Sequence, residues 1–206
     1  MLSERHVEIA QGDRVLIVGE PGTGKTILFR AIAGLWPWGS GQIGMPSPVE
    51  VMFVARQPYV PLGTLRAGLA YPASETAYNE EQFTAVLKSA GLDRLSSSLD
   101  LTERWDKELS DDEQQLLVFA RILLNKPRWV VIDEAFDAMD EEMRERIFAL
   151  FNDDLKETAI IHIGRPETKD HFFTRTLHLI KDPRGSCFIP DLSLRSGTPP
   201  MAGPAS

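Results

Sequence analysis

The sequence predicts an α/β fold with a mainly parallel sheet flanked by helices. Short apolar runs rich in β-branched residues recur along the chain, and longer segments with helical periodicity separate them. Strands that are apolar throughout are typical of parallel sheets, which are buried on both faces. The runs cover residues 14–18, 51–55, 129–132 and 159–163. Strands that alternate with helices therefore indicate an α/β fold.

The first of these strands leads into a phosphate-binding loop. Residues 19–26 read Gly-Glu-Pro-Gly-Thr-Gly-Lys-Thr, and residues 27–32 continue as a helix. A strand, a glycine-rich turn and a helix form the context that this motif requires. Glycines let successive backbone N–H groups converge on a phosphate, and the helix N-terminus adds its positive end. The loop therefore predicts nucleoside triphosphate binding, and the candidate residues are Gly19, Gly22, Thr23, Gly24, Lys25 and Thr26.

Two of these residues have further expected roles. Lys25 would neutralise the outer phosphates, and the Thr26 hydroxyl would bind Mg²⁺. A second acidic motif, Asp133-Glu134, directly follows the strand over 129–132. An aspartate at the end of a strand can hold Mg²⁺ through water, and an adjacent glutamate can act as general base on the reacting water. The two motifs together indicate a triphosphatase site, with Asp133 as a metal ligand and Glu134 as the catalytic base.

The remaining segments complete the predicted fold. Residues 7–9 alternate like the end of a strand, and residues 93–107 suggest loop and short turns. A closing hairpin is expected from residues 176–180 and 186–189. Helical periodicity is found over residues 64–70, 79–90, 110–124 and 140–156. The Ser/Gly/Pro/Ala-rich tail over 191–206 is expected to be disordered.

Composition limits the possible partners and environment. The net charge of -8 argues against a nucleic-acid groove, which needs a basic face, so no nucleic-acid partner is expected. The single cysteine, Cys187, excludes an internal disulfide framework and fits a reducing cytosol. No apolar run approaches the roughly 18–20 residues that span a bilayer. If the protein works at a membrane, another chain must hold it there, so a cytoplasmic, peripheral location is expected.

The order of motifs resembles that of ATP-binding-cassette (ABC) ATPases. In ring-forming AAA-type ATPases the acidic strand comes soon after the loop, whereas here residues 57–127 intervene. Residues 109–115, Leu-Ser-Asp-Asp-Glu-Gln-Gln, stand where ABC proteins have their LSGGQ-type signature. The resemblance covers about residues 7–190 and implies one P-loop nucleotide-binding domain over 1–190. It implies a helical subdomain, about 58–126, inserted between the Q-loop at Gln57 and the Walker B strand over 129–132, which ends in Asp133-Glu134.

Two segments narrow the resemblance. Residues 35–41, Leu-Trp-Pro-Trp-Gly-Ser-Gly, and residues 56–66 with Tyr71-Pro72 look like one branch of exporters. That branch includes peroxisomal fatty-acyl (adrenoleukodystrophy-type) transporters and bacterial transporters for antimicrobial peptides or vitamin B12. The resemblance implies ATP and Mg²⁺ as cofactors, a head-to-tail homo- or heterodimer of nucleotide-binding domains, and a membrane domain on a separate chain.

The resemblance also implies residue roles. Gln57 would sense Mg²⁺ and the γ-phosphate and couple them to the membrane domain. Asp133 would bind Mg²⁺ through water, and Glu134 would be the general base. Ser110, in the signature, would contact ATP held by the partner chain, and Asp140 would lie at the dimer seam.

Departures from the family pattern weaken this expected machinery. Asp111 and Asp112 replace both signature glycines. A carboxylate about 4 Å from a phosphate charge would cost up to about 4 kcal/mol at an effective dielectric near 20. Ser110 and Glu113 nevertheless match a capping box, so the helix should be stable while its grip on phosphate is spoiled.

The switch histidine of the family is replaced by Arg165, which follows Gly164. Arginine can clamp a γ-phosphate but cannot relay a proton. Strand alternation places His162 on the face opposite Arg165, where it is expected to be a polar residue near a strand end. Only residues 1–13 precede the loop strand, without Tyr, Phe or Trp, so the family's adenine-stacking aromatic and membrane domain are expected to be absent.

The function expected first is an ATP-binding and ATP-hydrolysing domain of an ABC transporter. A catalytically impaired partner in a heterodimer and a remnant of a split exporter are the alternatives. Asp111, Asp112 and Arg165 favour an impaired partner, whereas a neighbouring reading frame for a membrane domain would indicate a split gene. An ABC ATPase that acts on DNA or ribosomes fits the acidic charge less well.

Overall fold

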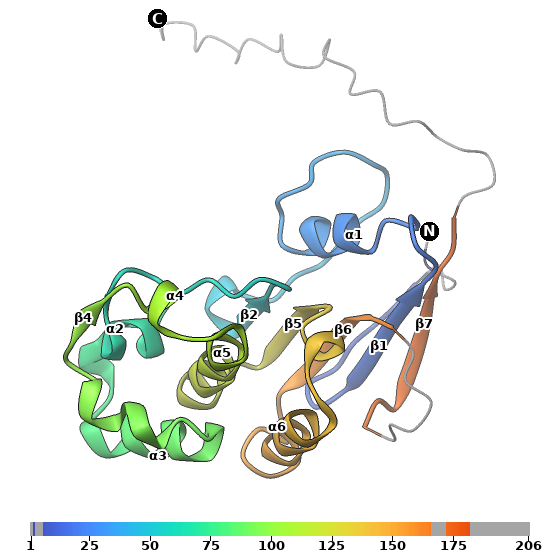
Figure 1. Ribbon diagram of the computed structural model, residues 1–206. Helices are drawn as coiled ribbons and strands as arrows, with labels where there is room; N and C mark the ends of the chain where they lie inside the picture. Colours follow the sequence, from blue (N-terminus) through green and yellow to red (C-terminus); the bar gives the residue numbers. More distant parts are fainter. Residues whose placement is uncertain (1, 3–5, 166–171, 182–206) are drawn as a thin grey trace, which may run out of the picture.

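The computed structural model describes residue 2, residues 6–165 and residues 172–181. In these residues a five-stranded sheet forms the centre of the molecule, in the order β2-β5-β6-β1-β7, with every pair parallel (Figure 1). This confirms the predicted α/β fold with a mainly parallel sheet. The strands are β1 (Arg14–Gly19), β2 (Val51–Val54), β5 (Trp129–Asp133), β6 (Ala159–Gly164) and β7 (Arg175–Leu179).

One prediction at the sheet edge is wrong, and a second is only partly covered by the described residues. Residues 7–9 form no strand; Val7 and Ile9 instead pack as partly buried side chains against the cluster around β1. An irregular segment that lies on a sheet buries alternate side chains too, which explains the misleading pattern. The last described strand, β7, pairs in parallel with β1, from Val15–Arg175 to Gly19–Leu179. The second strand of the expected hairpin, residues 186–189, lies outside the described residues.

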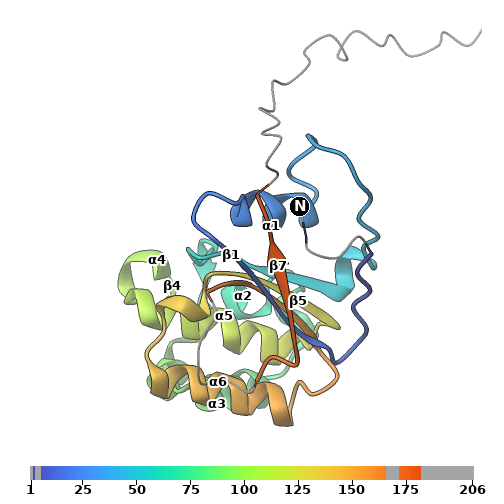
Figure 2. The same cartoon turned by 90° about the vertical axis from the view of Figure 1, so that its right-hand side faces the viewer.

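Helices cover both faces of the sheet. The helix α1 (Lys25–Ile32) packs Phe29 against one face, beside Val131 and Ile163. Alternate strand residues, such as Ile132 and Ile160, face the opposite side, where α5 (Asp111–Asn125) and α6 (Glu141–Asp153) pack. Figure 2 shows the same arrangement, with α1 above the strands and α5 and α6 below them. The fully apolar strands predicted by the sequence are therefore buried from both sides.

A helical insert follows β2 and carries its own core. Phe83 and Leu87 from α3 meet Leu117 from α5 there, and all three are fully buried. Because α5 also places Phe119 and Ile122 in the core under the sheet, it joins the insert to the sheet. The insert contains β3 (Gly63–Thr64), α2 (Leu65–Ala70), α3 (Glu80–Ala90), β4 (Thr102–Glu103), α4 (Trp105–Glu108) and α5. Short 3₁₀ turns occur at Pro48–Glu50, Glu75–Ala77, Asp93–Ser98 and Phe136–Ala138.

Side-chain caps fix where the main helices begin. Ser110 and Glu113 form the predicted capping box of α5, and Asn79 forms a second one on α3. The Asp140 carboxylate accepts a hydrogen bond from the Met143 N–H at 2.7 Å and caps α6. Such caps satisfy N–H groups that have no partner within the helix.

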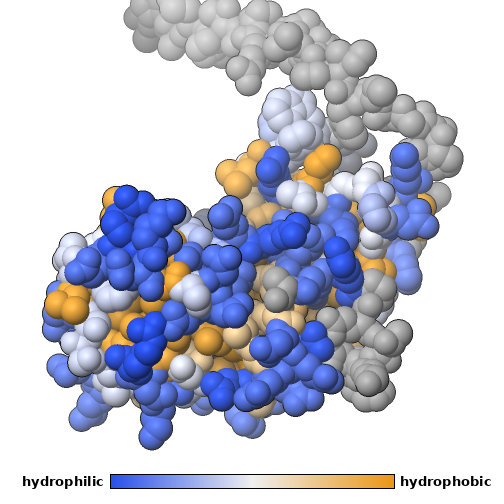
Figure 3. Space-filling model, in the orientation of Figure 1, coloured by the Kyte–Doolittle hydropathy of each residue, from blue (hydrophilic) through white to orange (hydrophobic). Residues whose placement is uncertain are grey.

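The surface of the described chain is largely polar. In Figure 3 most of the visible face is hydrophilic, and apolar surface shows mainly among the helices of the insert and beside α1. Among the residues that the structure describes, no helix is both long and apolar enough to cross a bilayer.

Candidate nucleotide site

The loop between β1 and α1 has the backbone shape that its glycines predict. Gly22 and Gly24 have φ values of 81° and 93°, in the left-handed region that side chains disfavour. A Cβ atom on Gly19 would lie 2.5 Å from Thr23 Oγ1, closer than any real contact. Thr23 itself donates its hydroxyl to the Glu20 carbonyl at 2.8 Å, which closes the turn. Glycine is therefore required at these positions by conformation or by space.

The start of α1 is open toward an anion. Its N-cap is Gly24, which has no side chain that could cap the first-turn N–H groups. These N–H groups and the helix dipole together form an anion-binding end. Thr26 lies exposed in the same turn, so its hydroxyl is accessible from the loop side. The loop geometry thus fits a bound phosphate group.

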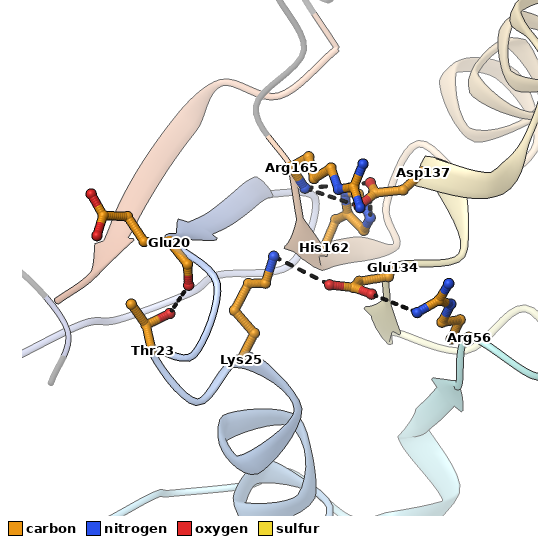
Figure 4. Close-up of polar contacts among 8 residues, drawn as sticks. All are labelled: Glu20, Thr23, Lys25, Arg56, Glu134, Asp137, His162 and Arg165. Carbon is orange, nitrogen blue, oxygen red and sulfur yellow. Dashed lines mark hydrogen bonds and ion pairs between the residues drawn. The ribbon is translucent and has the colours of Figure 1, made fainter. Parts of the chain in front are cut away.

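Two cations bracket Glu134 next to this loop (Figure 4). Lys25 Nζ lies 3.2 Å from Glu134 Oε1, and Arg56 Nη1 lies 3.5 Å from Glu134 Oε2. Glu134 has a φ of 53°, unusual for a residue with a side chain, and its N–H donates to the Ile163 carbonyl at 2.9 Å. The structure thus brings the loop lysine and the expected base together at the carboxyl ends of the strands.

Asp133 has the features of a cation ligand. It is buried, and among the described residues its Oδ1 atom has no hydrogen-bond partner. Burial raises the pKa of Asp133, the charge of Glu134 raises it further, and Lys25 lowers it. A buried carboxylate oxygen without a partner is costly, and a bound cation would remove that cost. The donors at Asp133 and Thr26, all oxygen atoms, fit Mg²⁺.

The other expected site residues occupy different positions. Gln57 is exposed just beyond β2, and it is the preceding residue, Arg56, that reaches Glu134. Ser110 caps α5 in the insert, where its Oγ accepts the Glu113 N–H at 3.2 Å. In both ribbon views α4, which ends just before Ser110, lies away from α1 (Figures 1 and 2). Within one chain Ser110 is therefore not part of the loop site.

Arg165 and His162 both meet Asp137. The Arg165 backbone N–H donates to Asp137 Oδ2 at 3.1 Å, and His162 Nε2 lies 3.5 Å from Asp137 Oδ1. His162 is 2% exposed, and its ring contacts those of Phe136 and Phe173. It is thus a core residue of β6, although a polar position near the strand end was expected. Arg165 lies beyond β6, where strand alternation no longer determines which groups can meet.

Burial is the largest effect on the pKa values of His162 and Asp137. It lowers the pKa of His162 to about 3, with a further decrease from the charge of Lys25. Burial also raises the pKa of Asp137, against the effect of the Arg165 N–H. His162 is therefore neutral at physiological pH. A neutral imidazole next to Asp137 places no full positive charge in the core, and neither of its ring nitrogens has a hydrogen-bond partner among the described residues.

Sequence reasoning gave no site role to Arg56 or Asp137, and it expected His162 only as a polar residue near a strand end. No local pattern indicated Arg56, which lies two residues beyond the end of β2. Asp137 comes three residues after Glu134, within the short turn Phe136–Ala138. Its neighbours come from β6, so only the fold brings them together.

Comparison with known proteins places this chain in a family. The family model described as "ABC transporter" matches residues 2–137. An uncharacterized ABC transporter ATP-binding protein of Haemophilus influenzae is 36% identical over 86% of this chain and 29% of its own length. ABC transporter D family member 1 of Dictyostelium discoideum is 30% identical over 72% of this chain and 22% of its own length. The human lysosomal cobalamin transporter ABCD4 is 31% identical over 87% of this chain and 31% of its own length.

A solved structure agrees with the fold. A bacterial Atm1-family ABC exporter with ATP bound matches 78% of this chain and 30% of its own chain, with a TM-score of 0.65 and 24% identity. The chain spans less than a third of the length of each of these relatives. The resemblance to the exporter branch that includes vitamin B12 transporters is confirmed by the D family and cobalamin relatives. With a phosphate loop facing an Asp-Glu pair and a family match over most of its length, this chain belongs to the ABC transporter family.

Proposed function

We propose that this chain is an ATP-binding and ATP-hydrolysing module that drives substrate movement through a separate membrane domain. The observation that carries the proposal is the contact of Lys25 with Glu134, 3.2 Å apart, next to the unpartnered Oδ1 atom of Asp133. The module would comprise residues 1–190, with the insert over about 58–126. It would act on the cytoplasmic side of the membrane, held there by its partner.

The mechanism follows from the positions of these side chains. ATP entering the loop would draw Lys25 from Glu134 to the outer phosphates, because a phosphate carries more charge than a carboxylate. Thr26 and Asp133 would hold Mg²⁺, which neutralises developing phosphate charge when bound. Glu134, released from Lys25, would orient and deprotonate water. Arg165 would clamp the γ-phosphate, and Gln57 would report its presence to the membrane domain.

A groove beside Gln57 suits the membrane partner. It has a volume of about 320 Å³ and lies between β2 and the end of α2. Tyr59 and Tyr71 line it with rings 5.8 Å apart and are 64% and 46% exposed. Arg121 fixes its floor by donating to the carbonyls of Tyr59 and Gly68. Because this chain matches less than a third of the length of each relative, we assign the groove to an apolar segment of the membrane domain.

Nucleotide affinity tests the proposal. Lys25→Ala is expected to weaken ATP binding by about 10- to 100-fold, since a hydrogen bond to a charged group contributes about 1.5–3 kcal/mol and 1.4 kcal/mol equals one decade. A fluorescent ATP analogue would be titrated into the folded chain with Mg²⁺. Lys88→Ala, at an exposed lysine of α3, is the matched control and should bind as wild type does. Unchanged affinity in Lys25→Ala would contradict a nucleotide site at this loop.

A second function is favoured by one specific observation. Asp111 and Asp112 are exposed in the first turn of α5, directly after Ser110. In a head-to-tail pair this end would face the ATP of the partner chain, where carboxylates repel phosphate. We infer that the chain could instead serve as a non-hydrolysing subunit whose partner supplies an intact signature. It would then bind ATP without turning it over alone.

A further inference from the structure

We propose that Arg56 is a positioning residue that masks the charge of Glu134 while ATP enters the loop. The proposal rests on the proposed function, because it concerns the same nucleotide site. Arg56 is not among the site residues expected from the sequence. The proposal gives it a position beside the nucleotide that was expected of its neighbour Gln57.

The contacts of Glu134 carry the proposal. Its two carboxylate oxygens are divided between two cations, with Lys25 on Oε1 and Arg56 on Oε2. Once Lys25 turns to the phosphates, only Arg56 of these two cations stays beside Glu134. A bare carboxylate next to incoming phosphates would repel them, and a paired one repels them less. Arg56 therefore lowers the electrostatic cost of ATP entry.

A hydrogen bond from α5 holds the backbone of Arg56 in place. Gln115 donates its amide N–H to the Arg56 carbonyl at 2.9 Å, and this glutamine is only 7% exposed. The Arg56 side chain itself is 75% exposed, so the guanidinium lies at the mouth of the site rather than in the core. Since Gln115 belongs to α5, the helix that begins at Ser110, the position of Arg56 is linked to the signature helix.

The pairing has a second effect, on the chemistry of Glu134. A cation beside Oε2 hinders water from binding there, so it restrains the base. Removing the guanidinium should then weaken ATP binding but speed up the hydrolysis of bound ATP. We expect KM and kcat to rise together in Arg56→Gln, each by up to about fivefold, the range for exposed ion pairs.

A double-mutant comparison separates this role from a merely structural one. ATP affinity would be measured with a fluorescent ATP analogue for Arg56→Gln and Arg56→Lys, each with Glu134 present and in the Glu134→Gln background. We expect Arg56→Gln to weaken binding only where Glu134 is charged, and Arg56→Lys to restore it. Arg128→Gln, which breaks the exposed ion pair with Glu50, is the control and should change nothing.

Two results would overturn the inference. Equal affinity in wild type and Arg56→Gln would show that Arg56 masks nothing. An equal loss in both backgrounds would show that Arg56 acts on the phosphates directly and not through Glu134. In either case a normal loss of binding in Lys25→Ala would leave the nucleotide site standing. Unchanged binding in Lys25→Ala would instead overturn the proposed function itself.

Discussion

Neutralising Asp111 and Asp112 together is expected to increase ATP-dependent pairing of two chains by up to about a thousandfold. A single carboxylate about 4 Å from a phosphate charge costs up to about 4 kcal/mol at an effective dielectric near 20, which is roughly three decades. Screening of two exposed carboxylates keeps their combined effect within about that range. Both side chains are exposed at the start of α5. Asparagine is the better replacement than glycine, because glycine would also weaken the helix.

The helix should survive this change. Its capping box uses Ser110 and Glu113, and Glu113 is further paired with Arg94, so neither Asp111 nor Asp112 is needed for the cap. Pairing would be measured by analytical ultracentrifugation with Mg²⁺ and ATP, in a Glu134→Gln background to prevent turnover. Glu80→Gln with Glu81→Gln, in the first turn of α3, is the matched control. Equal pairing before and after neutralisation would contradict the assigned role of the acidic signature.

Replacing Phe136 by alanine is expected to lower the free energy of unfolding by about 3–5 kcal/mol, as for other buried phenylalanines. Phe136 is 1% exposed and lies against the rings of Phe119, Phe148 and His162, with centroids 5.5, 5.1 and 5.0 Å away. It follows Glu134 by two positions. Its packing therefore holds the segment that carries the expected base and Asp137.

Denaturant unfolding would measure this loss, with Phe53→Ala as control. Phe53 lies on the edge strand β2, is 39% exposed and contacts Phe29 edge to face. Its replacement leaves a smaller cavity and should cost less than half as much. Equal losses for the two variants would contradict the view that Phe136 anchors the site.

Local physics explains which parts of the fold were predictable. The strands around Val131 and Ile161 are apolar on both faces, and a short β-branched run of this kind favours a buried strand. The start of α5 was predictable because a capping box involves only four consecutive residues. The direction of β7 was not, because a strand pattern carries no information about its neighbour. The pattern of residues 7–9 was misleading for a similar reason, because alternate buried side chains do not show that the backbone pairs with a neighbouring strand.

Some residues of the candidate site could be predicted from a local motif, and others could not. Gly22, Gly24 and Lys25 are set by a local motif, and the structure gives that motif the expected backbone shape. Arg56 and Asp137 matter through partners 78 and 28 residues away in the chain, at Glu134 and Arg165. Such contacts depend on the order of strands in the sheet, which periodicity does not reveal. The roles of Gln57, Ser110 and Arg165 remain predictions.

The role proposed for Glu134 is that of the base in a working ATP site. Steady-state Mg²⁺-ATP turnover of the folded chain, measured beside its Glu134→Gln variant, tests it most directly. We expect a measurable rate that falls by at least about a hundredfold in the variant, the lower range for general base catalysis, while ATP affinity is retained. Equal, background-level rates in the two proteins would contradict it and favour the non-hydrolysing subunit.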